Sequence, residues 1–421
     1  MRSVSGPADM SRVSHSVKPF LDEDRCLVAG VRAQAWDYTD AETQRLTHNI
    51  HRYSGKFIPQ IAARAISLLT APGELVLDPY CGSGTTLLEA LLLGRRALGF
   101  DLSPLAVLIA RTKVTPVSTH DLDQLRQELV QSLAPLRIRA DLPPCRSSQK
   151  QLTMKSHVRK DPRVSDGWFR KWFRPDILEE LVAIDQAIQK ITDARTRRVA
   201  GVALSNILRR SSNAHSGYPN VMFHKDVPRR SLPLNPFFHE LDRICDMVAS
   251  LETAKAQWQD ARVELGNAAS LPLEDGSVDA IVSHPPYIGS IPYAEYGVLS
   301  LKWLGVDPKE LDRKLTGGRR QARDVVERFQ KDYSRTLHET ARVLRPGRHA
   351  FFMVGNPIVH GTTVDLAALT IDLANQAGFR LVVREFRKGV NRRANKMGAE
   401  QLLFFQKQAE SVRFKLGGSR A

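Results

Sequence analysis

The chain has 421 residues, of which 42% are hydrophobic, and it carries a formal net charge of +16 at pH 7. Its length allows two or three domains with a buried core. The excess of basic residues favours a polyanionic partner, with nucleic acid the first candidate, over a merely basic surface. No apolar run reaches the ~20 residues of a membrane-spanning helix, and no apolar leader follows a basic start. We therefore expect a soluble, cytoplasmic protein with no membrane partner.

The four cysteines lie far apart in the sequence, at Cys26, Cys81, Cys145 and Cys245. No pair has the short spacing of a zinc site or a redox motif. This distribution suits a reducing compartment and predicts that the protein holds no metal.

Two segments of the chain alternate strands and helices, and a helix-rich segment separates them. In the first, a strand at 75–78, a glycine-rich turn, a helix at 85–93 and a strand at 96–101 follow one another. This order is typical of a doubly wound nucleotide-binding sheet. The second contains predicted strands at 263–267, 278–282, 349–355, 380–387 and 401–407, with a turn at 344–347 before the third. We expect an extension over 1–36, the two halves of one α/β domain over 37–116 and 259–410, a helical insertion over 117–258 and a tail over 411–421.

The glycine-rich turn reads Asp78-Pro-Tyr-Cys-Gly-Ser-Gly-Thr-Thr86. Its glycines, Gly82 and Gly84, let the backbone approach a ligand closely at the end of a strand. A third glycine, as in a dinucleotide site, and the Gly-Lys pair of a phosphate-binding loop are both missing. The turn therefore favours a ligand with an amino-acid part and a nucleoside but no phosphates. Asp78 could accept from an ammonium group, and Asp101, at the end of the next strand, from ribose hydroxyls.

A second motif, Ser283-His-Pro-Pro-Tyr287, ends another predicted strand. Two adjacent prolines cannot continue a central ladder, so the chain leaves the sheet and the Pro285 carbonyl points toward a pocket. The amino group of a base is a poor nucleophile because its lone pair is delocalised into the ring. Acceptors on its N–H bonds, such as this carbonyl and His284, would localise that lone pair. Tyr287 could stack on a base extruded from the helix.

Together these two motifs resemble the amino-methyltransferase family of DNA methylases, which modify cytosine at N(4) or adenine at N(6). The resemblance covers roughly 45–115 and 262–408. It implies an α/β, Rossmann-like, seven-stranded mixed sheet (class I S-adenosylmethionine-dependent methyltransferase) with an inserted helical domain. It also implies S-adenosylmethionine as cofactor, double-stranded DNA as partner, and direct methyl transfer without a metal. A partner restriction endonuclease would follow if the enzyme serves restriction–modification.

The resemblance also implies roles for individual residues. The segment 51–57 looks like the one that closes over the methionine end of the cofactor. The expected cofactor-binding residues are Lys56, Phe57, Asp78, Tyr80, Gly82, Gly84, Thr85, Asp101 and Asn267, the last in place of a commoner aspartate. The expected catalytic residues are Ser283, His284, Pro285, Pro286 and Tyr287.

His284 departs from the family, which has Ser, Asp or Asn before Pro-Pro-Tyr. A neutral imidazole can still accept one hydrogen bond. Because aspartate is absent and Ser283 is adjacent, we predict cytosine N(4) as the target, with adenine N(6) as the alternative. Two further alternatives are an RNA guanine-N(2) methyltransferase, which shares the Pro-Pro-Tyr logic, and a catalytically silent nucleic-acid binder.

Basic residues in the helical segment and in two later loops are candidates for contacts to DNA. They are Arg209, Arg210, Lys225, Arg229, Arg230, Arg319, Arg320, Arg387, Lys388, Arg392 and Arg393. Aromatic residues at Trp168, Trp172 and Phe173 alternate with basic ones. That cluster is either a face for nucleic acid or part of a buried core.

Overall fold

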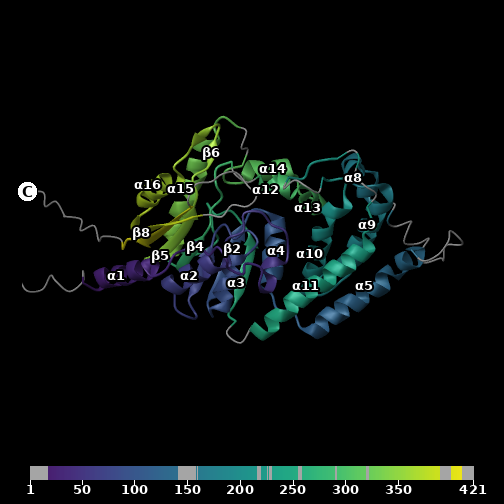
Figure 1. The fold of residues 1–421 in the computed structure, drawn as a ribbon, viewed down its shortest axis with the longest axis horizontal. Coiled ribbons are helices and arrows are strands. Elements are labelled where there is room, and N and C mark those ends of the chain that lie inside the picture. The colour runs from purple at the N-terminus through teal and green to yellow at the C-terminus, as the bar shows by residue number, and fades with distance from the viewer. Residues whose placement is uncertain are drawn as a thin grey trace, which may run out of the picture.

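A seven-stranded sheet forms the centre of the α/β part of the molecule, in the order β3-β2-β1-β4-β5-β9-β8 (Figure 1). The computed structural model describes residues 18–140, 158, 160–215, 220–224, 226, 230–254, 258–289, 292–318, 322–388 and 400–409. The strands are β1 (Leu75–Asp78), β2 (Arg96–Asp101), β3 (Ala261–Leu265), β4 (Val278–Ser283), β5 (Leu344–Val354), β8 (Phe379–Arg387) and β9 (Glu400–Lys407). Strands β1 to β5 run parallel, and β9 is antiparallel to both its neighbours. The predicted fold class, a Rossmann-like mixed sheet, is confirmed.

Helices cover both faces of this sheet. One face carries α1 (Lys18–Arg32), α2 (Pro59–Leu69), α3 (Thr85–Leu92) and α4 (Pro104–Lys113). The other carries α15 (Val325–Val343) and α16 (Leu366–Gln376). Successive side chains of a strand point to opposite faces, so Val76 enters the first core and Leu77 the second. Both faces are therefore apolar, as expected for a parallel sheet that is buried on both sides.

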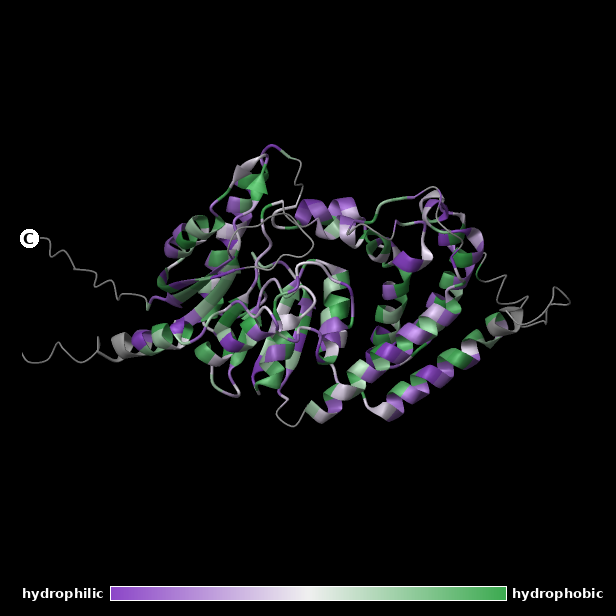
Figure 2. Cartoon of the chain, viewed as in Figure 1, coloured by the Kyte–Doolittle hydropathy of each residue, from purple (hydrophilic) through white to green (hydrophobic). Residues whose placement is uncertain are grey.

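The helical segment between α4 and β3 contributes most of a further core, to which α4 and the segment 294–311 also contribute. Its helices are α5 (Thr119–Ala140), α7 (Pro162–Ser165), α8 (Gly167–Trp172), α9 (Pro175–Gln189), α10 (Ala194–Ser211) and α11 (Leu234–Ala254). Apolar and polar positions alternate along α5 and α11 (Figure 2), as in helices that bury one side only. Trp172 and Phe173 are buried in this core, so they support the structural reading of the aromatic cluster. No helix in the described ranges is both long and apolar enough to cross a membrane.

Shorter elements fill the connections that follow β4 and β5. They are α12 (Tyr293–Tyr296), α13 (Val298–Trp303), α14 (Pro308–Lys314), β6 (Ile358–Val359) and β7 (Thr362–Thr363), and a 3-10 helix, η1 (Leu46–Asn49), precedes α2. The helix α10 packs against both α4 and α13. The helical segment is thereby joined to the carboxyl end of the sheet, where the predicted site lies.

Within the expected extension at 1–36, the structure has the helix α1, and apolar residues from this helix and from the residues after it are buried. Trp36 is only 1% exposed, and its indole N–H donates to the Val31 carbonyl at 2.9 Å. The guanidinium of Arg64 lies 4.1 Å from the centre of the indole ring. Leu27, Val31 and Trp36 therefore pack in the α/β core. The buried apolar residues of this segment are few and are divided between the helix and the loop after it, so the sequence shows no clear helical periodicity.

Two predicted element bounds also differ from the structure. Strand β3 ends at Leu265, because the chain turns at Gly266 and the Asn267 side chain accepts from the backbone N–H of Ala269 at 3.0 Å. The turn expected at 344–347 belongs to β5, which starts at Leu344 with a shifted register against β4. Gly347 adopts a φ of 78° inside that strand, so the chain bends there without leaving the sheet.

Gly84 starts α3 and is held against α4. Its φ is 81°, and a Cβ there would lie 2.9 Å from the Cβ of Ala110. We expect Gly84→Ala to lower the free energy of unfolding by about 2 kcal/mol, through both backbone strain and the steric clash. Gly73 is a matched control, since its φ is 83° but nothing lies within 4 Å. Gly73→Ala should cost only about 1 kcal/mol. Equal losses in urea denaturation would show that contact with α4 contributes nothing.

Candidate active site

A cavity of about 330 Å³ opens at the carboxyl ends of β1, β2 and β4. Its wall includes Gly82, Asp101 and His284 from the sheet side, and Ser205 and Arg209 from α10. A smaller hollow of about 30 Å³ shares Tyr80, Gly82 and His284 with it. The structure thus brings the glycine-rich turn, the end of β2 and the Pro-Pro-Tyr loop to one place. In an open α/β sheet this edge is where ligands bind.

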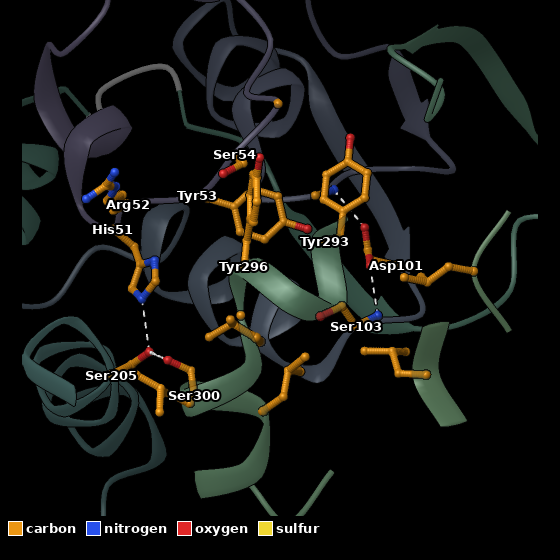
Figure 3. Close-up of a pocket in the computed structure, with 18 of the residues that line it drawn as sticks. His51, Arg52, Tyr53, Ser54, Asp101, Ser103, Ser205, Tyr293, Tyr296 and Ser300 are labelled. Atoms are coloured by element: carbon orange, nitrogen blue, oxygen red, sulfur yellow. Dashed lines mark hydrogen bonds between the residues drawn. The ribbon is translucent and has the colours of Figure 1, made fainter. Parts of the chain in front are cut away.

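Asp101 ends β2 inside the larger cavity (Figure 3). Its Oδ2 accepts from the backbone N–H of Gly82 at 3.0 Å, and its Oδ1 from that of Ser103 at 2.8 Å. These bonds fix the carboxylate and leave further lone pairs on both oxygens for a ligand. Burial raises the pKa of Asp101 to about 6.

Asp78 lies at the end of β1 and lines the smaller hollow. It is 3% exposed, and its Oδ1 accepts from the Ser283 hydroxyl at 2.7 Å and from the Tyr80 backbone N–H at 3.1 Å. Burial raises the pKa of this carboxyl to about 6, although these hydrogen bonds oppose the shift. The Ser283 hydroxyl therefore faces Asp78 and is fully buried.

Lys56 and Phe57 form another side of the smaller hollow. The Lys56 ammonium donates to the backbone carbonyls of His48 and His51, at 3.1 and 3.0 Å. Burial lowers the pKa of Lys56 to about 8. The Phe57 ring lies 5.4 Å from the imidazole of His284, centre to centre. This segment therefore packs beside the Ser-His-Pro-Pro-Tyr loop.

The Ser-His-Pro-Pro-Tyr loop leaves the sheet after Ser283, where β4 ends. His284 and Pro286 line the larger cavity, whereas Pro285 is buried. The Nε2 atom of His284 lies 2.7 Å from the Tyr287 hydroxyl. Burial lowers the pKa of His284 to about 4, so the imidazole is neutral at physiological pH. Tyr287 is 6% exposed, and its ring packs beside Gly355 and lines neither hollow.

Other tyrosines, which the sequence analysis did not single out, face the larger cavity. They are Tyr53, Tyr293 and Tyr296. The rings of Tyr53 and Tyr293 are stacked at 6.2 Å with an interplanar angle of 29°. Figure 3 shows these three tyrosines in the cavity wall, with Tyr293 near Asp101. A signal was available, since Tyr293 and Tyr296 are three residues apart just after the Pro-Pro-Tyr loop and so share a helix face.

On the opposite side of the cavity, His51, Ser205 and Ser300 form a buried hydrogen-bonded row (Figure 3). The His51 Nε2 lies 2.9 Å from the Ser205 hydroxyl, which lies 2.8 Å from that of Ser300. Burial lowers the pKa of His51 to about 3, so this row carries no charge at neutral pH. It links the segment before β1 to α10 and α13.

Some predicted cofactor residues lie away from the cavity. The Asn267 side chain is exposed and caps its own turn, while its neighbours Gly266 and Ala268 line the wall. Gly84 shapes the turn without touching either hollow, and Thr85 lines the smaller one. The roles assigned to these residues remain predictions.

Three of the predicted DNA contacts, Arg209, Arg210 and Arg230, line the cavity. Each also donates to a backbone carbonyl: Arg209 to that of Asn220, Arg210 to that of Pro236 and Arg230 to that of Ala214. They are therefore held in place at the mouth of the site.

The prediction for Arg387 needs correction. Arg387 is 5% exposed and donates to Glu400 at 2.6 Å, so its guanidinium does not lie on the surface. The Lys388 side chain is exposed, and its backbone N–H donates to Asp37. The remaining predicted contacts, Lys225, Arg229, Arg319, Arg320, Arg392 and Arg393, lie outside the described residues.

The residues present fit a nucleoside joined to an amino acid. Asp101 offers carboxylate acceptors for the hydroxyls of a ribose in the larger cavity. Asp78 offers a buried carboxylate for an ammonium group in the smaller one. Gly82, which lines both, has a φ of 49° and no side chain to obstruct a ligand between them. The two acceptors and the open turn match the parts of S-adenosylmethionine, the cofactor of the family that the motifs resemble.

Comparisons with known proteins find DNA methylases that are similar to this chain. Residues 21–112 match a family model described as DNA methylase. The Type II methyltransferase M.MvaI of Kocuria varians is 23% identical over 409 residues, which cover 85% of this chain and 87% of that protein. The Type II methyltransferase M.MjaII of Methanocaldococcus jannaschii is 22% identical over 442 residues, covering 85% and 79%. The chain is therefore similar to DNA methylases, both in the segment that contains the glycine-rich turn and over most of its length.

Proposed function

We propose that the protein transfers a methyl group from S-adenosylmethionine to the exocyclic amino group of a flipped base in double-stranded DNA, most specifically to N(4) of cytosine. The observation that carries the proposal is the single cavity shared by Asp101 and the His284-Pro-Pro loop. A ligand held at the end of β2 and a base held at the end of β4 would meet there. Methyl transfer to an amino group requires that meeting of donor and acceptor.

When bound, S-adenosylmethionine supplies a methyl group activated by its sulfonium. The protein's task is then to bind, to orient and to exclude water. Asp101 would hold the ribose hydroxyls, and Asp78 the ammonium group. The Pro285 carbonyl accepts no backbone hydrogen bond from the described residues, and we assign it to one N–H of the target amino group, although Pro285 lines neither hollow. His284 would accept the other N–H, because its imidazole is neutral.

Double-stranded DNA is the proposed substrate for three reasons. The chain carries a net charge of +16, which favours binding to phosphates. Arg209, Arg210 and Arg230 stand at the cavity. The relatives described above are Type II methyltransferases. Because the cavity lies at the sheet edge, between the sheet and α10, the target base would leave the duplex to enter it. A partner restriction endonuclease stays a prediction.

The choice of cytosine follows from the residue before Pro-Pro-Tyr. Position 284 is histidine, without the aspartate that in this family accompanies adenine. The Ser283 hydroxyl gives no independent support, since it donates to Asp78 instead of facing the cavity. The proposal for N(4) therefore rests on the absence of aspartate, and N(6) of adenine is the outcome that would replace it.

The experiment is to incubate the protein with methyl-labelled S-adenosylmethionine and either unmethylated duplex DNA or tRNA, then digest the nucleic acid and identify the nucleosides by mass spectrometry. Label in N(4)-methylcytosine is expected. Label in N(6)-methyladenine would keep the mechanism and change the base. Label in tRNA alone would overturn the DNA proposal, and no label in either would favour the silent binder.

Cofactor binding should weaken in mild acid. The pKa values of Asp78 and Asp101 are both about 6, so at pH 5 each carboxyl is mostly protonated and no longer a charged acceptor. We expect the affinity for S-adenosylmethionine to fall about tenfold for each carboxylate, or about 100-fold for both, between pH 7 and pH 5, measured by calorimetry. An affinity that stays constant over this range would contradict the role of both carboxylates.

The two carboxyls do not confound that measurement by unfolding the protein. Their folded pKa values lie above the unfolded value of 3.8. Between these values the folded state binds more protons than the unfolded state, so both groups favour folding as the pH falls through this window. Thermal unfolding at pH 5 provides the control for the other titrating groups.

A further inference from the structure

A chain of hydrogen-bonded side chains leads from the cavity to the strands β9 and β8. The Nε2 atom of His284 lies 2.7 Å from the Tyr287 hydroxyl. That hydroxyl donates to Oε1 of Glu400 at 3.2 Å, and Arg387 donates to Oε2 of Glu400 at 2.6 Å. Tyr287 and Arg387 are 6% and 5% exposed. Since Arg387 and Glu400 are cross-strand partners in β8 and β9, the sheet itself holds the end of this chain in register.

The direction of each hydrogen bond in this chain is determined by its ends. A guanidinium can only donate and a carboxylate can only accept, so Glu400 accepts from both Arg387 and Tyr287. The Tyr287 hydroxyl has one proton, and that proton is used toward Glu400. Its oxygen must therefore accept from His284, which places the imidazole proton on Nε2. A neutral imidazole has one N–H, so Nδ1 keeps its lone pair.

That lone pair is free for a substrate. His284 lines both hollows, and its Nδ1 makes no hydrogen bond to any residue of the described ranges. The opposite tautomer would present an N–H to the cavity and would repel the N–H of an amino group. Which nitrogen carries the proton therefore decides whether His284 can act as an acceptor.

We propose that Glu400, oriented by Arg387, is a positioning residue that holds His284 in the Nε2–H tautomer, so that Nδ1 accepts an N–H of the target amino group. This inference rests on the proposed amino-methyltransferase function and goes beyond it, because it assigns a role to residues outside the two sequence motifs. It also accounts for a histidine at a position where the family has Ser, Asp or Asn.

The test is Glu400→Gln, which preserves shape and reverses polarity. Because Arg387 can only donate, the glutamine carbonyl will turn toward it and the amide NH₂ toward Tyr287. The tyrosine oxygen then accepts from the amide, its proton points at Nε2, and His284 takes its proton on Nδ1. We expect kcat on unmethylated DNA to fall about tenfold or more, as when a catalytic histidine is left in the wrong tautomer. The affinity for S-adenosylmethionine should stay the same, since Glu400 lines neither hollow.

A double-mutant cycle separates this role from a structural one. In His284→Ser the hydroxyl oxygen keeps a lone pair whichever way its proton points, so it can accept an N–H without any choice of tautomer. Glu400→Gln should therefore cost nothing further in the His284→Ser background. An equal loss in both backgrounds would overturn the proposal. Glu74→Gln is the matched control, because Glu74 forms an ion pair with Arg348 on β5 and is not connected to the cavity. It should leave kcat unchanged.

The tautomer can also be read without turnover. In two-bond ¹H–¹⁵N spectra of the imidazole, the wild type should show His284 protonated at Nε2 and Glu400→Gln should show it protonated at Nδ1. A wild-type spectrum with the proton on Nδ1 would refute the proposal even if the enzyme methylates DNA. The expected spectra with no methylation would leave the tautomer assignment intact and overturn the proposed function. If His284→Ser is inactive, these spectra alone decide.

Discussion

Tyr287→Ala should lower kcat about 1000-fold while S-adenosylmethionine still binds. The ring of Tyr287 packs beside Gly355, and its hydroxyl orients His284, so its removal frees the loop that places both predicted acceptors. Displacement of a positioned group by about 1 Å can already cost 100-fold. The affinity for the cofactor should change by less than about threefold, because Tyr287 does not touch either hollow. Single-turnover kinetics on unmethylated DNA and calorimetry with the cofactor measure the two quantities.

Two further variants separate the loss of the Tyr287 hydroxyl from the loss of packing. Tyr287→Phe keeps the ring and loses the hydroxyl, so it should reproduce only the smaller loss expected of Glu400→Gln. Tyr333→Ala is the matched control for lost packing, since Tyr333 is buried in the same core but lies on α15. Both alanine variants should lose about 3 kcal/mol of stability. If Tyr287→Ala turns over like the wild type, the assignment of the Pro-Pro-Tyr loop to the site is refuted.

Asp101→Ala should weaken the binding of S-adenosylmethionine about 100-fold. The carboxylate would lose its hydrogen bonds to the ribose, and the backbone N–H groups of Gly82 and Ser103 would lose their acceptor. Hydrogen bonds to a charged group contribute about 1.5–3 kcal/mol each, and ~2.7 kcal/mol corresponds to the stated factor. With saturating cofactor, kcat should recover most of its value, because Asp101 is assigned to binding and not to the transfer itself.

Asp242→Ala provides the charge control for this variant. Asp242 forms an exposed ion pair with Arg126 in the helical segment, so its loss changes the net charge equally. Calorimetry should find the cofactor affinity of this control unaltered. An Asp101→Ala protein that binds the cofactor like the wild type would remove Asp101 from the site.

The strands of the sheet and the two motifs could be predicted because their signals are local. Asp78 and Asp101 each end a short apolar strand, and the glycines that follow Asp78 mark a turn within a few residues of it. The two prolines after His284 likewise mark the end of β4, because they cannot continue a strand. The carboxyl ends of parallel strands lie at the same edge of a sheet. Residues that end such strands therefore come together in the fold, and no long-range information from the sequence is needed to predict this.

The relation between Glu400 and the site could not be predicted in the same way. It depends on the pairing of β8 with β9, which sets Arg387 opposite Glu400, and on the position of β9 beside β5. From the sequence, Arg387 was one more basic residue in a basic loop. Its burial and its carboxylate partner follow from tertiary pairing, which reverses the predicted role. The burial of Trp36 could not be predicted for the same reason, because Trp36 contacts Arg64 and Phe351, which are distant in the sequence.

The wall that α10 contributes to the cavity limits how this protein can be re-engineered. Ser205, Asn206 and Arg209 belong to the helical segment, yet they line the same space as Asp101. A chimaera that exchanged this segment for that of a relative would replace part of the cavity wall as well as the predicted DNA contacts. The helical segment and the sheet are therefore not separable modules around this cavity, and a graft would need matching changes at His51 and Ser300, which bond to Ser205.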